Sequence, residues 1–216
     1  MRVASAAWIF VIPLTLVGIG ISLVGWPVCA GFFFLLALYC LFFFRDPKRE
    51  IPTDEGTLVC PADGKVDEIE TVCHPDFPGG RAVKVGIFLS VFDVHINRAP
   101  ITGSVIRKKH RKGRFLSAMK KESSRENESN LLVFLTEKGP VHVKQIAGLI
   151  ARRIVCTVKS GQEVKTGERI GLICFGSRTE AYMPTHFVVK VKIGMRVQGG
   201  STILAVVPGP DQSESR

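Results

Sequence analysis

The sequence predicts a mainly β fold, a compact β-sandwich or barrel, behind an N-terminal α-helical hairpin that lies in a membrane. Residues 3–44 carry no charged side chain, and every acidic residue follows Arg45. From Gly56 onward, short runs of β-forming residues alternate with turn signals. A pattern of valines and glycines at 158–170 returns at 191–203, which indicates two related halves.

Composition sets the first limits on function. The chain has 216 residues, of which 46% are apolar, so it can bury a core and is not a disordered tail. Its length excludes a large multi-domain assembly, and the crowding of apolar residues at the front excludes a polytopic transporter. With 29 basic and 19 acidic residues, the formal charge is +10. We therefore expect a membrane anchor at 1–44 and a basic, β-rich domain at 45–216.

The anchor fits two short helices. A spanning helix needs about 20 apolar residues, and the apolar stretch is interrupted by Gly25-Trp26-Pro27. Proline is favoured in the first turn of a helix, so Pro27 suits the start of the second one. Basic residues stand at both outer ends, Arg2 before the stretch and Arg45, Lys48 and Arg49 after it. They predict that the β-rich domain lies on the cytoplasmic face of the cell membrane. A single span or a re-entrant segment remains an alternative, whereas a cleaved signal peptide is opposed by the length of the stretch.

The six cysteines are expected to be free thiols in a reducing compartment. They form no C-x-x-C pair, so neither a metal site nor a redox motif is expected. They are Cys29, Cys40, Cys60, Cys73, Cys156 and Cys174.

The β-rich domain is predicted to be built from short strands. These strands are expected at 56–59, 64–72, 81–89, 101–109, 130–136, 141–147, 153–157, 169–173, 179–183 and 203–207. The one segment with helical character is 114–130, which is polar and places Phe115, Leu116 and Met119 on one side. It could equally be a mobile loop.

The repeated pattern predicts sharp turns. Residues 158–170 read V-K-S-G-Q-E-V-K-T-G-E-R-I, and residues 191–203 read V-K-I-G-M-R-V-Q-G-G-S-T-I. Glycines three residues either side of a valine suit turns between short strands. Lipoyl and biotinyl carrier domains show similar turns, which indicates two lipoyl-like halves. The lysine-bearing tip that such carriers modify has no counterpart here.

Three short motifs could carry chemistry. The first is P-A-D-G-K at 61–65, which alone reads as a turn. The second is F-D-V-H-I-N-R-A-P at 92–100, where strand alternation puts Asp93 and His95 on one side. The third is F-G-S-R at 175–178, which lacks the second glycine of the hydrolase nucleophile elbow.

Together these motifs resemble the short form of the phosphatidylserine decarboxylase proenzymes. F-F-F-R-D-P, P-A-D-G-K, D-V-H-I-N-R-A-P and a late Gly-Ser step occur in the family's order, from about Phe42 to Val207. The D-V-H-x-N-R-A-P stretch is the most specific of them.

The resemblance implies a self-made cofactor. Family members cut themselves at the Gly-Ser step, here between Gly176 and Ser177, and convert the serine into a pyruvoyl group. That ketone forms a Schiff base with the amine of phosphatidylserine and accepts the electrons left when carbon dioxide departs. The product is phosphatidylethanolamine, without pyridoxal phosphate or a metal. The pieces 1–176 and 177–216 are then expected to stay together as a heterodimer.

Site roles follow from the same resemblance. Asp63 matches the aspartate that orients a histidine during self-cleavage, and His95 matches the histidine that donates a proton during decarboxylation. Longer members carry a second histidine where this chain has Arg98, and arginine is a poor base. Either His95 serves both steps or Asp63 acts with another group; we expect the former. Arg98 and Asp93 are expected to bind substrate, the guanidinium by holding a carboxylate or phosphate.

A basic run at 107–114 points to a charged partner. A solvated surface is the simplest interpretation, and no nucleic-acid module accompanies the run. Beside a membrane anchor, an anionic phospholipid surface is the expected partner, worth about 1 kcal/mol per basic residue. A homo-oligomer is possible.

Two other functions remain open. One is a membrane-tethered, non-enzymatic lipoyl-like adaptor or carrier. The other is a related pyruvoyl decarboxylase that acts on a soluble amino acid, although a soluble substrate gives no reason for an anchor.

Overall fold

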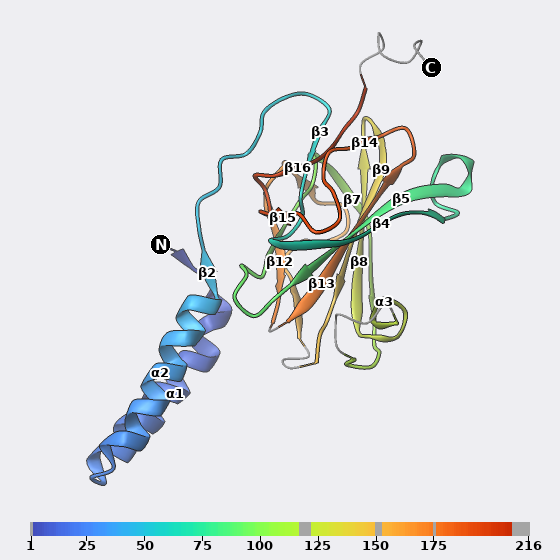
Figure 1. Ribbon diagram of the computed structural model, residues 1–216. Helices are drawn as coiled ribbons and strands as arrows, with labels where there is room; N and C mark the ends of the chain where they lie inside the picture. The colour runs from blue at the N-terminus through green and yellow to red at the C-terminus, as the bar shows by residue number, and fades with distance from the viewer. Residues whose placement is uncertain (1, 117–121, 150–152, 175, 209–216) are drawn as a thin grey trace. The chain divides into compact units, whose positions relative to one another are not determined.

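The chain forms two compact units, Met1–Lys48 and Arg49–Arg216. The structure is a computed structural model that describes residues 2–116, 122–149, 153–174 and 176–208 (Figure 1). The first unit is helical and the second consists mainly of strands, so the predicted mainly β class with an N-terminal helical segment is confirmed.

The helical unit is a hairpin of α1 (Trp8–Leu23) and α2 (Pro27–Phe43). The chain reverses at Gly25, whose φ of 86° is open to glycine at little cost. Pro27 occupies the first turn of α2, as expected. The helices pack closely, because a Cβ atom on Gly18 would lie 2.9 Å from the ring of Phe34. A short 3-10 helix, η1 (Ser5–Ala7), precedes α1, and β1 (Arg2–Val3) pairs with β2 (Arg45–Asp46).

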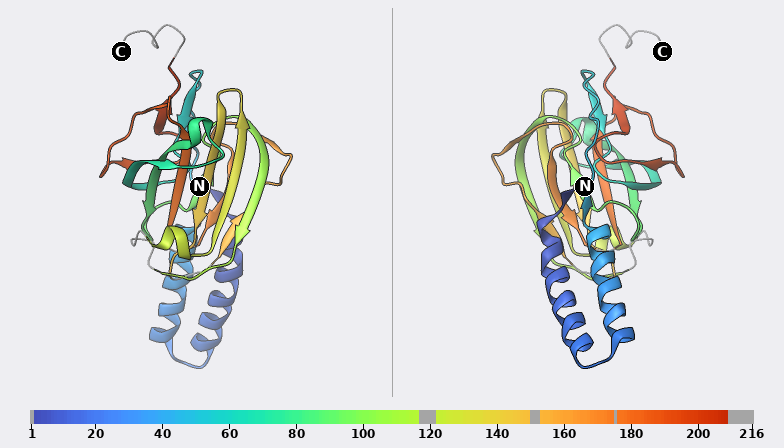
Figure 2. Two further views of the ribbon diagram at one scale, coloured as in Figure 1. Left: turned by 90° about the vertical axis from the view of Figure 1, so that its right-hand side faces the viewer. Right: turned by 90° about the vertical axis from the view of Figure 1, so that its left-hand side faces the viewer.

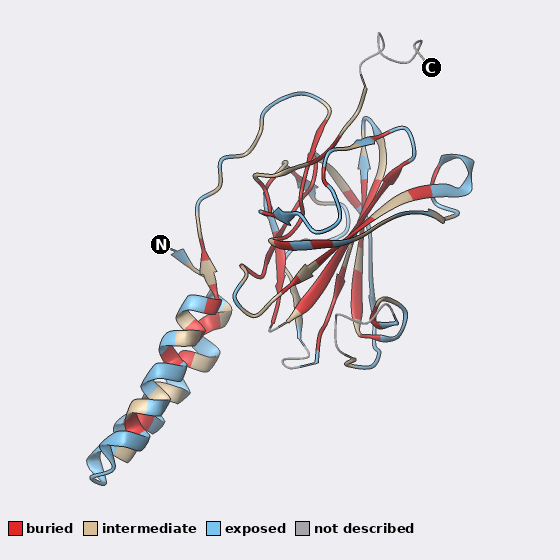
Figure 3. Ribbon diagram, viewed as in Figure 1, coloured by how far each residue is buried: buried red, intermediate tan, exposed pale blue. Residues whose placement is uncertain are grey.

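The surface of this hairpin suits lipid. Among the described residues, Ser5–Leu23 is the one helical stretch long and apolar enough to cross a membrane, and α2 is apolar but shorter. Much of both helices is exposed (Figure 3). The exposed residues include large apolar ones, among them Ile12, Leu16, Phe32, Leu35 and Leu38. An exposed apolar surface of this size marks a membrane or protein contact, so the hairpin supports membrane association.

The second unit is built around an eight-stranded antiparallel sheet, which curls strongly (Figure 2). In spatial order its strands are β11 (Glu163–Val164), β7 (Gly103–Arg111), β8 (Ser129–Thr136), β9 (Gly139–Ile146), β13 (Ser177–Pro184), β5 (Arg81–Leu89), β4 (Gly64–Cys73) and β15 (Arg196–Val197). A short 3-10 helix, η2 (Pro78–Gly80), lies between β4 and β5.

Two three-stranded sheets complete this unit. Their orders are β10 (Ile154–Cys156), β12 (Arg169–Ile173), β6 (Ile96–Arg98) and β14 (Val188–Val189), β16 (Ile203–Val206), β3 (Thr57–Val59). One continuous apolar core connects the three sheets; its largest fully buried members include Leu58, Ile87, Leu132, Phe134, Ile170, Met183 and Leu204.

β13 is buried on both faces, which explains why its sequence mixes polar and apolar residues. Ala181 and Met183 face the apolar core. Successive strand residues point to opposite faces, so Arg178, Glu180 and Tyr182 face the other way, into a buried polar layer. All eight residues of the strand are buried.

The repeated sequence pattern corresponds to a structural repeat. Its four spaced glycines, Gly161, Gly167, Gly194 and Gly200, all have positive φ. β11 pairs with the start of β7, and β15 pairs with the start of β4 in the same way.

The partner segments of the repeat match as well. The Gly167 N–H donates to Ala99 O (2.8 Å), and the Gly200 N–H donates to Cys60 O (2.9 Å). Ala99 and Cys60 each precede a proline and lie four residues before a glycine. The expected pair of related halves is therefore confirmed. The matching segments that contain Ala99 and Cys60 are a further part of the repeat, which was not predicted.

Most predicted strands are present with ends shifted by one or two residues. Those at 81–89 and 169–173 coincide with β5 and β12. The strands that were not predicted have two or three residues each; they are β1, β2, β6, β11, β14 and β15. All six cysteines are free, as expected.

The helical alternative for 114–130 is wrong for the described part of that segment. Only α3 (Ser123–Glu126) is helical, and residues 117–121 lie outside the described residues. The buried Asn127 accepts from Leu116 N–H and donates to Leu116 O, both at 2.8 Å. An asparagine side chain that bonds main-chain groups in this way competes with helix formation.

Candidate active site

The Gly176–Ser177 step lies where a loop enters the central sheet. Ser177 is the first residue of β13 and pairs with Leu89 of β5. Gly176 has a φ of 68°, a left-handed conformation that disfavours side chains other than glycine. The peptide bond between them therefore joins a glycine-dependent turn to the first residue of β13.

Ser177 presents a buried hydroxyl. The residue is fully buried, and no hydrogen-bond partner for Oγ exists among the described residues. Leaving a buried polar atom unpaired costs about 1–3 kcal/mol. Such an atom in a native fold calls for an explanation, and a reactive role is one of the few available.

His95 faces the same turn. It lies in the connection from β5 to β6 and is buried, and its main-chain O accepts from Ile173 N–H (3.2 Å). Its Nδ1 lies 2.9 Å from Asp93 O, and the Gly176 N–H donates to its Nε2 at 3.2 Å. A carbonyl only accepts and an N–H only donates, so the imidazole is neutral with its proton on Nδ1. The Nε2 lone pair thus points at the residue that precedes Ser177.

Asp63 is held by two groups. Its Oδ2 lies 2.5 Å from Nη2 of Arg49, and its Oδ1 accepts from Gly199 N–H at 2.8 Å. Burial raises the pKa of this carboxyl, against the opposing effects of Arg49 and Gly199. A buried carboxyl with a perturbed pKa is typical of functional sites.

Comparison of the two halves of the repeat distinguishes two roles of Asp63. Thr102 is the equivalent residue in the other half, and its hydroxyl accepts from Thr166 N–H at 3.0 Å. One carboxylate oxygen of Asp63 therefore closes a turn, as Thr102 does, and the other binds Arg49. From the sequence, Arg49 was predicted only to help orient the anchor in the membrane. The expected role of Asp63 in orienting a histidine stays a prediction, since the Nδ1 contact of His95 is with Asp93 O.

Asp93 and Arg98 both have structural contacts. The Asp93 carboxylate accepts from the N–H and the hydroxyl of Ser90, at 2.8 and 2.7 Å, and pairs with Arg196 at 3.1 Å. Buried Arg98 donates to Gly167 O at 3.0 Å. Their expected contacts with substrate stay predictions.

The nearby thiols are not competing nucleophiles. Burial raises the pKa of Cys174 to about 11, against a lowering effect of the Arg153 charge. Burial also raises the pKa of Cys60, with a further contribution from Asp63. The thiolate is the nucleophilic form of cysteine. Neither Cys174 nor Cys60 therefore competes with Ser177 as a nucleophile.

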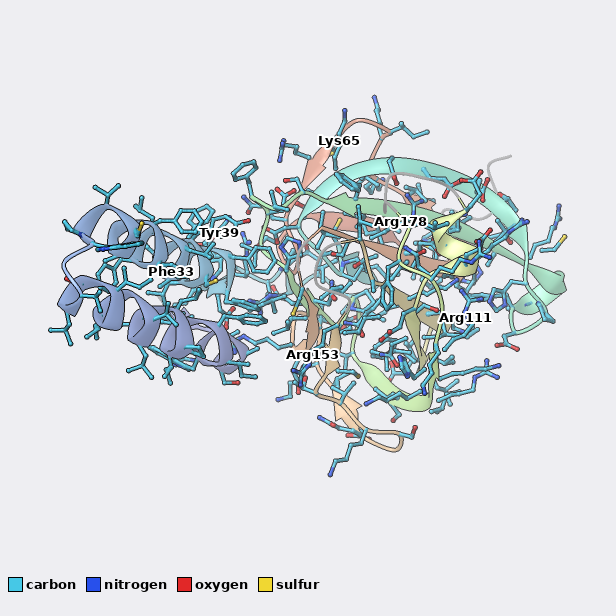
Figure 4. All side chains as sticks on the ribbon, turned by 90° about the horizontal axis from the view of Figure 1, so that it is seen from below. Phe33, Tyr39, Lys65, Arg111, Arg153 and Arg178 are labelled. Atoms are coloured by element: carbon cyan, nitrogen blue, oxygen red, sulfur yellow. The ribbon has the colours of Figure 1, made fainter. Side chains whose placement is uncertain are left out.

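Arg178, the residue after Ser177, anchors the start of β13 (Figure 4). Its side chain is 3% exposed and contacts three carboxylates. Nε lies 3.0 Å from Glu180 Oε1, Nη2 lies 2.6 Å from Glu68 Oε2, and Nη1 pairs with Asp67. This cluster was not predicted, because its members lie on two strands, β4 and β13, that are far apart in the sequence.

Arg153 is a second missed cation. It is exposed (Figure 4) and precedes β10, which pairs with β12. The Cys174 N–H donates to Arg153 O at 3.0 Å. Arg153 therefore lies beside Cys174, which is two positions before Gly176 in the sequence.

The basic run at 107–114 is largely engaged within the fold. Arg107 pairs with Asp76, His110 with Glu128 and Arg114 with Glu126. Arg111 donates to Ser124 O and Asn127 O. These contacts are exposed and therefore weak, so the expected role of the run at an anionic lipid surface stays a prediction.

Comparison with known proteins gives one family. The family model described as phosphatidylserine decarboxylase matches residues 36–205. The phosphatidylserine decarboxylase proenzyme of Burkholderia pseudomallei (strain 1106a) is 41% identical over 207 residues, 95% of each chain. That of Wolbachia pipientis wMel is 48% identical over 173 residues, 78% of this chain and 75% of its own. That of Desulfotalea psychrophila is 44% identical over 178 residues, 82% and 83% of the two chains.

The three motifs, the buried Ser177 next to the contact between Gly176 and His95, and these matches agree with one another. The chain belongs to the phosphatidylserine decarboxylase family of carboxy-lyases.

Proposed function

We propose that the chain cuts itself between Gly176 and Ser177 and decarboxylates phosphatidylserine with a pyruvoyl group made from Ser177. One observation carries the proposal: a buried serine hydroxyl without a partner among the described residues, next to a glycine that bonds a neutral histidine. An adaptor has no use for that arrangement. The unpaired Oγ also fits a residue destined for chemical conversion rather than for a structural contact.

The cleavage uses groups of the chain itself and one water molecule. The Ser177 Oγ attacks the Gly176 carbonyl carbon, and the Gly176–Ser177 amide bond breaks as an ester forms. Elimination then releases the Gly176 carboxylate from Cβ of residue 177. Water adds to the resulting unsaturated residue and ammonia leaves, which accounts for every atom. The pieces 1–176 and 177–216 remain paired through the sheet.

His95 is the base in this proposal. Its Nε2 lone pair accepts from Gly176 N–H, one residue from Ser177, and its Nδ1 proton is held by Asp93 O. A small rotation of the turn would exchange the Gly176 N–H for the Ser177 hydroxyl as donor. Arg98, which replaces the second histidine of longer members, is engaged with Gly167 O and is not suited to proton transfer.

In decarboxylation the same imidazole moves a proton. A pyruvoyl group supplies the ketone that accepts the electron pair left when carbon dioxide departs. In each turnover His95 takes up a proton from solvent and donates it to the α-carbon that carbon dioxide has left. The buried surroundings of residue 177 limit the number of water molecules at the reacting atoms.

The His95→Gln variant should cut itself at least about 100-fold more slowly than the unaltered chain. Glutamine can still accept the Gly176 N–H, but it cannot take a proton, and general bases contribute about 10²–10⁴ in rate. The fraction of cut chain after synthesis, followed by intact mass, measures the effect. His186→Gln changes an exposed histidine and should cut normally. Normal cutting by His95→Gln would rule out His95 as the base.

We also propose that Arg153 binds the phosphate of the lipid headgroup. It is exposed beside Cys174, and planar guanidinium groups bind phosphate through paired hydrogen bonds. The apolar hairpin would hold the enzyme at the membrane, with the β unit on the cytoplasmic side. The anionic membrane surface would then deliver substrate toward this guanidinium.

Arg153→Ala should raise KM for phosphatidylserine about 10- to 100-fold. A hydrogen bond to a charged group contributes about 1.5–3 kcal/mol, which corresponds to that range. Self-cleavage should be unaffected, and Arg153→Lys should recover part of the loss. Lys138→Ala, which removes an exposed cation outside the basic run, is the matched control. An unchanged KM in Arg153→Ala would remove Arg153 from the substrate site.

A further inference from the structure

A second cluster of polar side chains lies on the face of the sheet opposite Ser177. It consists of His74 and Asp76, in the connection from β4 to β5, and His142 on β9. His142 pairs with Tyr182 of β13, so its side chain shares a face with Tyr182. Tyr182 and Ser177 alternate along β13, which puts them on opposite faces. The cluster is therefore separate from the candidate active site.

His142 has an unexplained environment. It is fully buried, and neither of its ring nitrogens has a hydrogen-bond partner in the described part of the chain. Its ring lies 4.6 Å from that of Phe77 and 4.9 Å from that of His74, measured between centroids. A neutral imidazole carries one donor and one acceptor. A buried polar group that is left unpaired in this way commonly marks a missing water or ion.

The neighbours of His142 supply metal-ligand atoms. One nitrogen of each histidine and one carboxylate oxygen of Asp76 all lie within 4.8 Å of one another. The Asp76 N–H donates to His74 Nδ1 at 3.4 Å, which leaves Nε2 as the ligand atom of His74.

We propose that His74, Asp76 and His142 bind a divalent transition-metal ion of the Zn²⁺ class. Two imidazoles and a carboxylate match the ligand preference of that ion, and water would complete the shell. The ion would link the connection between β4 and β5 to β9. This departs from the expectation that the chain binds no metal, which rested on local motifs, whereas His74 and His142 are distant in sequence.

Two features of the cluster must adjust for the ion. Tetrahedral Zn²⁺ with bonds of about 2.0–2.1 Å needs ligand atoms about 3.4 Å apart, so the outer ligands must move inward. The connection that carries them contains Gly79 and Gly80, which have open space around them. Asp76 also pairs with Arg107, but both side chains are substantially exposed. An exposed ion pair contributes only about 0–1 kcal/mol and can give way.

Zinc titration of the purified full-length protein tests the proposal, with Co²⁺ absorption reporting the coordination geometry. We expect one ion per chain with at least micromolar affinity, a tetrahedral Co²⁺ spectrum and a rise in melting temperature. His74→Ala and Asp76→Asn, which alter partly exposed residues, should each weaken binding at least tenfold. His142→Phe keeps the bulk of the buried ring and should also lose binding. Arg107→Gln should strengthen binding, since it removes a competing cation.

His110→Ala is the matched control, because His110 lies outside the cluster and pairs with Glu128. It should bind zinc as the unaltered chain does. Absence of saturable binding at micromolar zinc would overturn the proposal. Equal binding by the unaltered chain and His74→Ala would overturn it too, because the ion would then lie elsewhere. Self-cleavage is not a readout of this experiment, so the site can fail without affecting the proposed function.

Discussion

The Ser177→Ala variant should remain a single chain of 216 residues that folds and does not decarboxylate phosphatidylserine. The change removes the only atom proposed to attack the Gly176 carbonyl. It should not weaken the fold, because Oγ makes no hydrogen bond to the described residues and the cavity left is one oxygen in size. Intact mass under denaturing conditions measures the result. The unaltered protein should give two pieces, the smaller one lighter by one ammonia than a peptide that begins with serine.

Ser129→Ala provides the matched control for this experiment. Ser129 is also a buried serine at the start of a strand, β8, but it is distant in sequence from the Gly-Ser step. This variant should cut and turn over normally. Cleavage at the same bond in Ser177→Ala would show that another residue attacks. An uncut but decarboxylating Ser177→Ala chain would refute the pyruvoyl proposal altogether.

The Arg178→Met variant should be destabilised by about 3–5 kcal/mol, the usual cost of removing one partner from a buried ion pair. Asp67, Glu68 and Glu180 would then lose the guanidinium that they share. For a unit of this size the loss corresponds to a melting temperature lower by roughly 6–20 °C. The comparison is best made in the uncut Ser177→Ala chain, so that cleavage does not differ between samples.

The control for Arg178 is Arg196→Met. Arg196 also pairs with a carboxylate, Asp93, but its side chain is 75% exposed, so the loss should stay below about 1 kcal/mol. Similar melting temperatures for the two variants would show that the buried cluster does not hold β13.

At acid pH, the free energies of unfolding of Arg178→Met and its parent chain should differ less than at neutral pH. Although burial alone raises the pKa of Glu180, hydrogen bonds from Tyr182 and Ser124 and the charges of Lys144 and Arg178 lower it below its ordinary 4.5. A carboxyl whose pKa is lower in the folded state stabilises the fold above the unfolded pKa. That stabilisation is lost as the pH falls through the folded value. The effect of Arg178→Met should therefore be largest near neutrality and shrink below about pH 4.5.

Sequence patterns predicted the parts of this fold that have local signals. Strands such as β5 are long enough to show a β-type run, and the glycines of the repeat mark turns that require positive φ. Two-residue strands such as β11 have no period to detect and exist only through their partners. The helix prediction for 114–130 failed because the buried side chain of Asn127 makes hydrogen bonds that replace those of a helix.

The residues of the candidate site also divide into those that have a local sequence signal and those that do not. Gly176, Ser177 and His95 were predictable, because they lie in short motifs with a known order. Arg178 was not assigned a role, because its partners Asp67 and Glu68 are 111 and 110 positions away in the chain. Arg49 was assigned to membrane orientation, since nothing near it in the sequence points to Asp63.

The position of β13 has a consequence for how the enzyme would lose its structure if it is cut as we propose. The segment 177–216 supplies β13, between β5 and β9, as well as β15 beside β4 and β16 beside β3. Before the cut, refolding is a reaction of one molecule. After the cut, two chains must find each other, so refolding depends on protein concentration. The rate of strand separation, rather than an equilibrium between folded and unfolded forms, then sets the working lifetime of the enzyme.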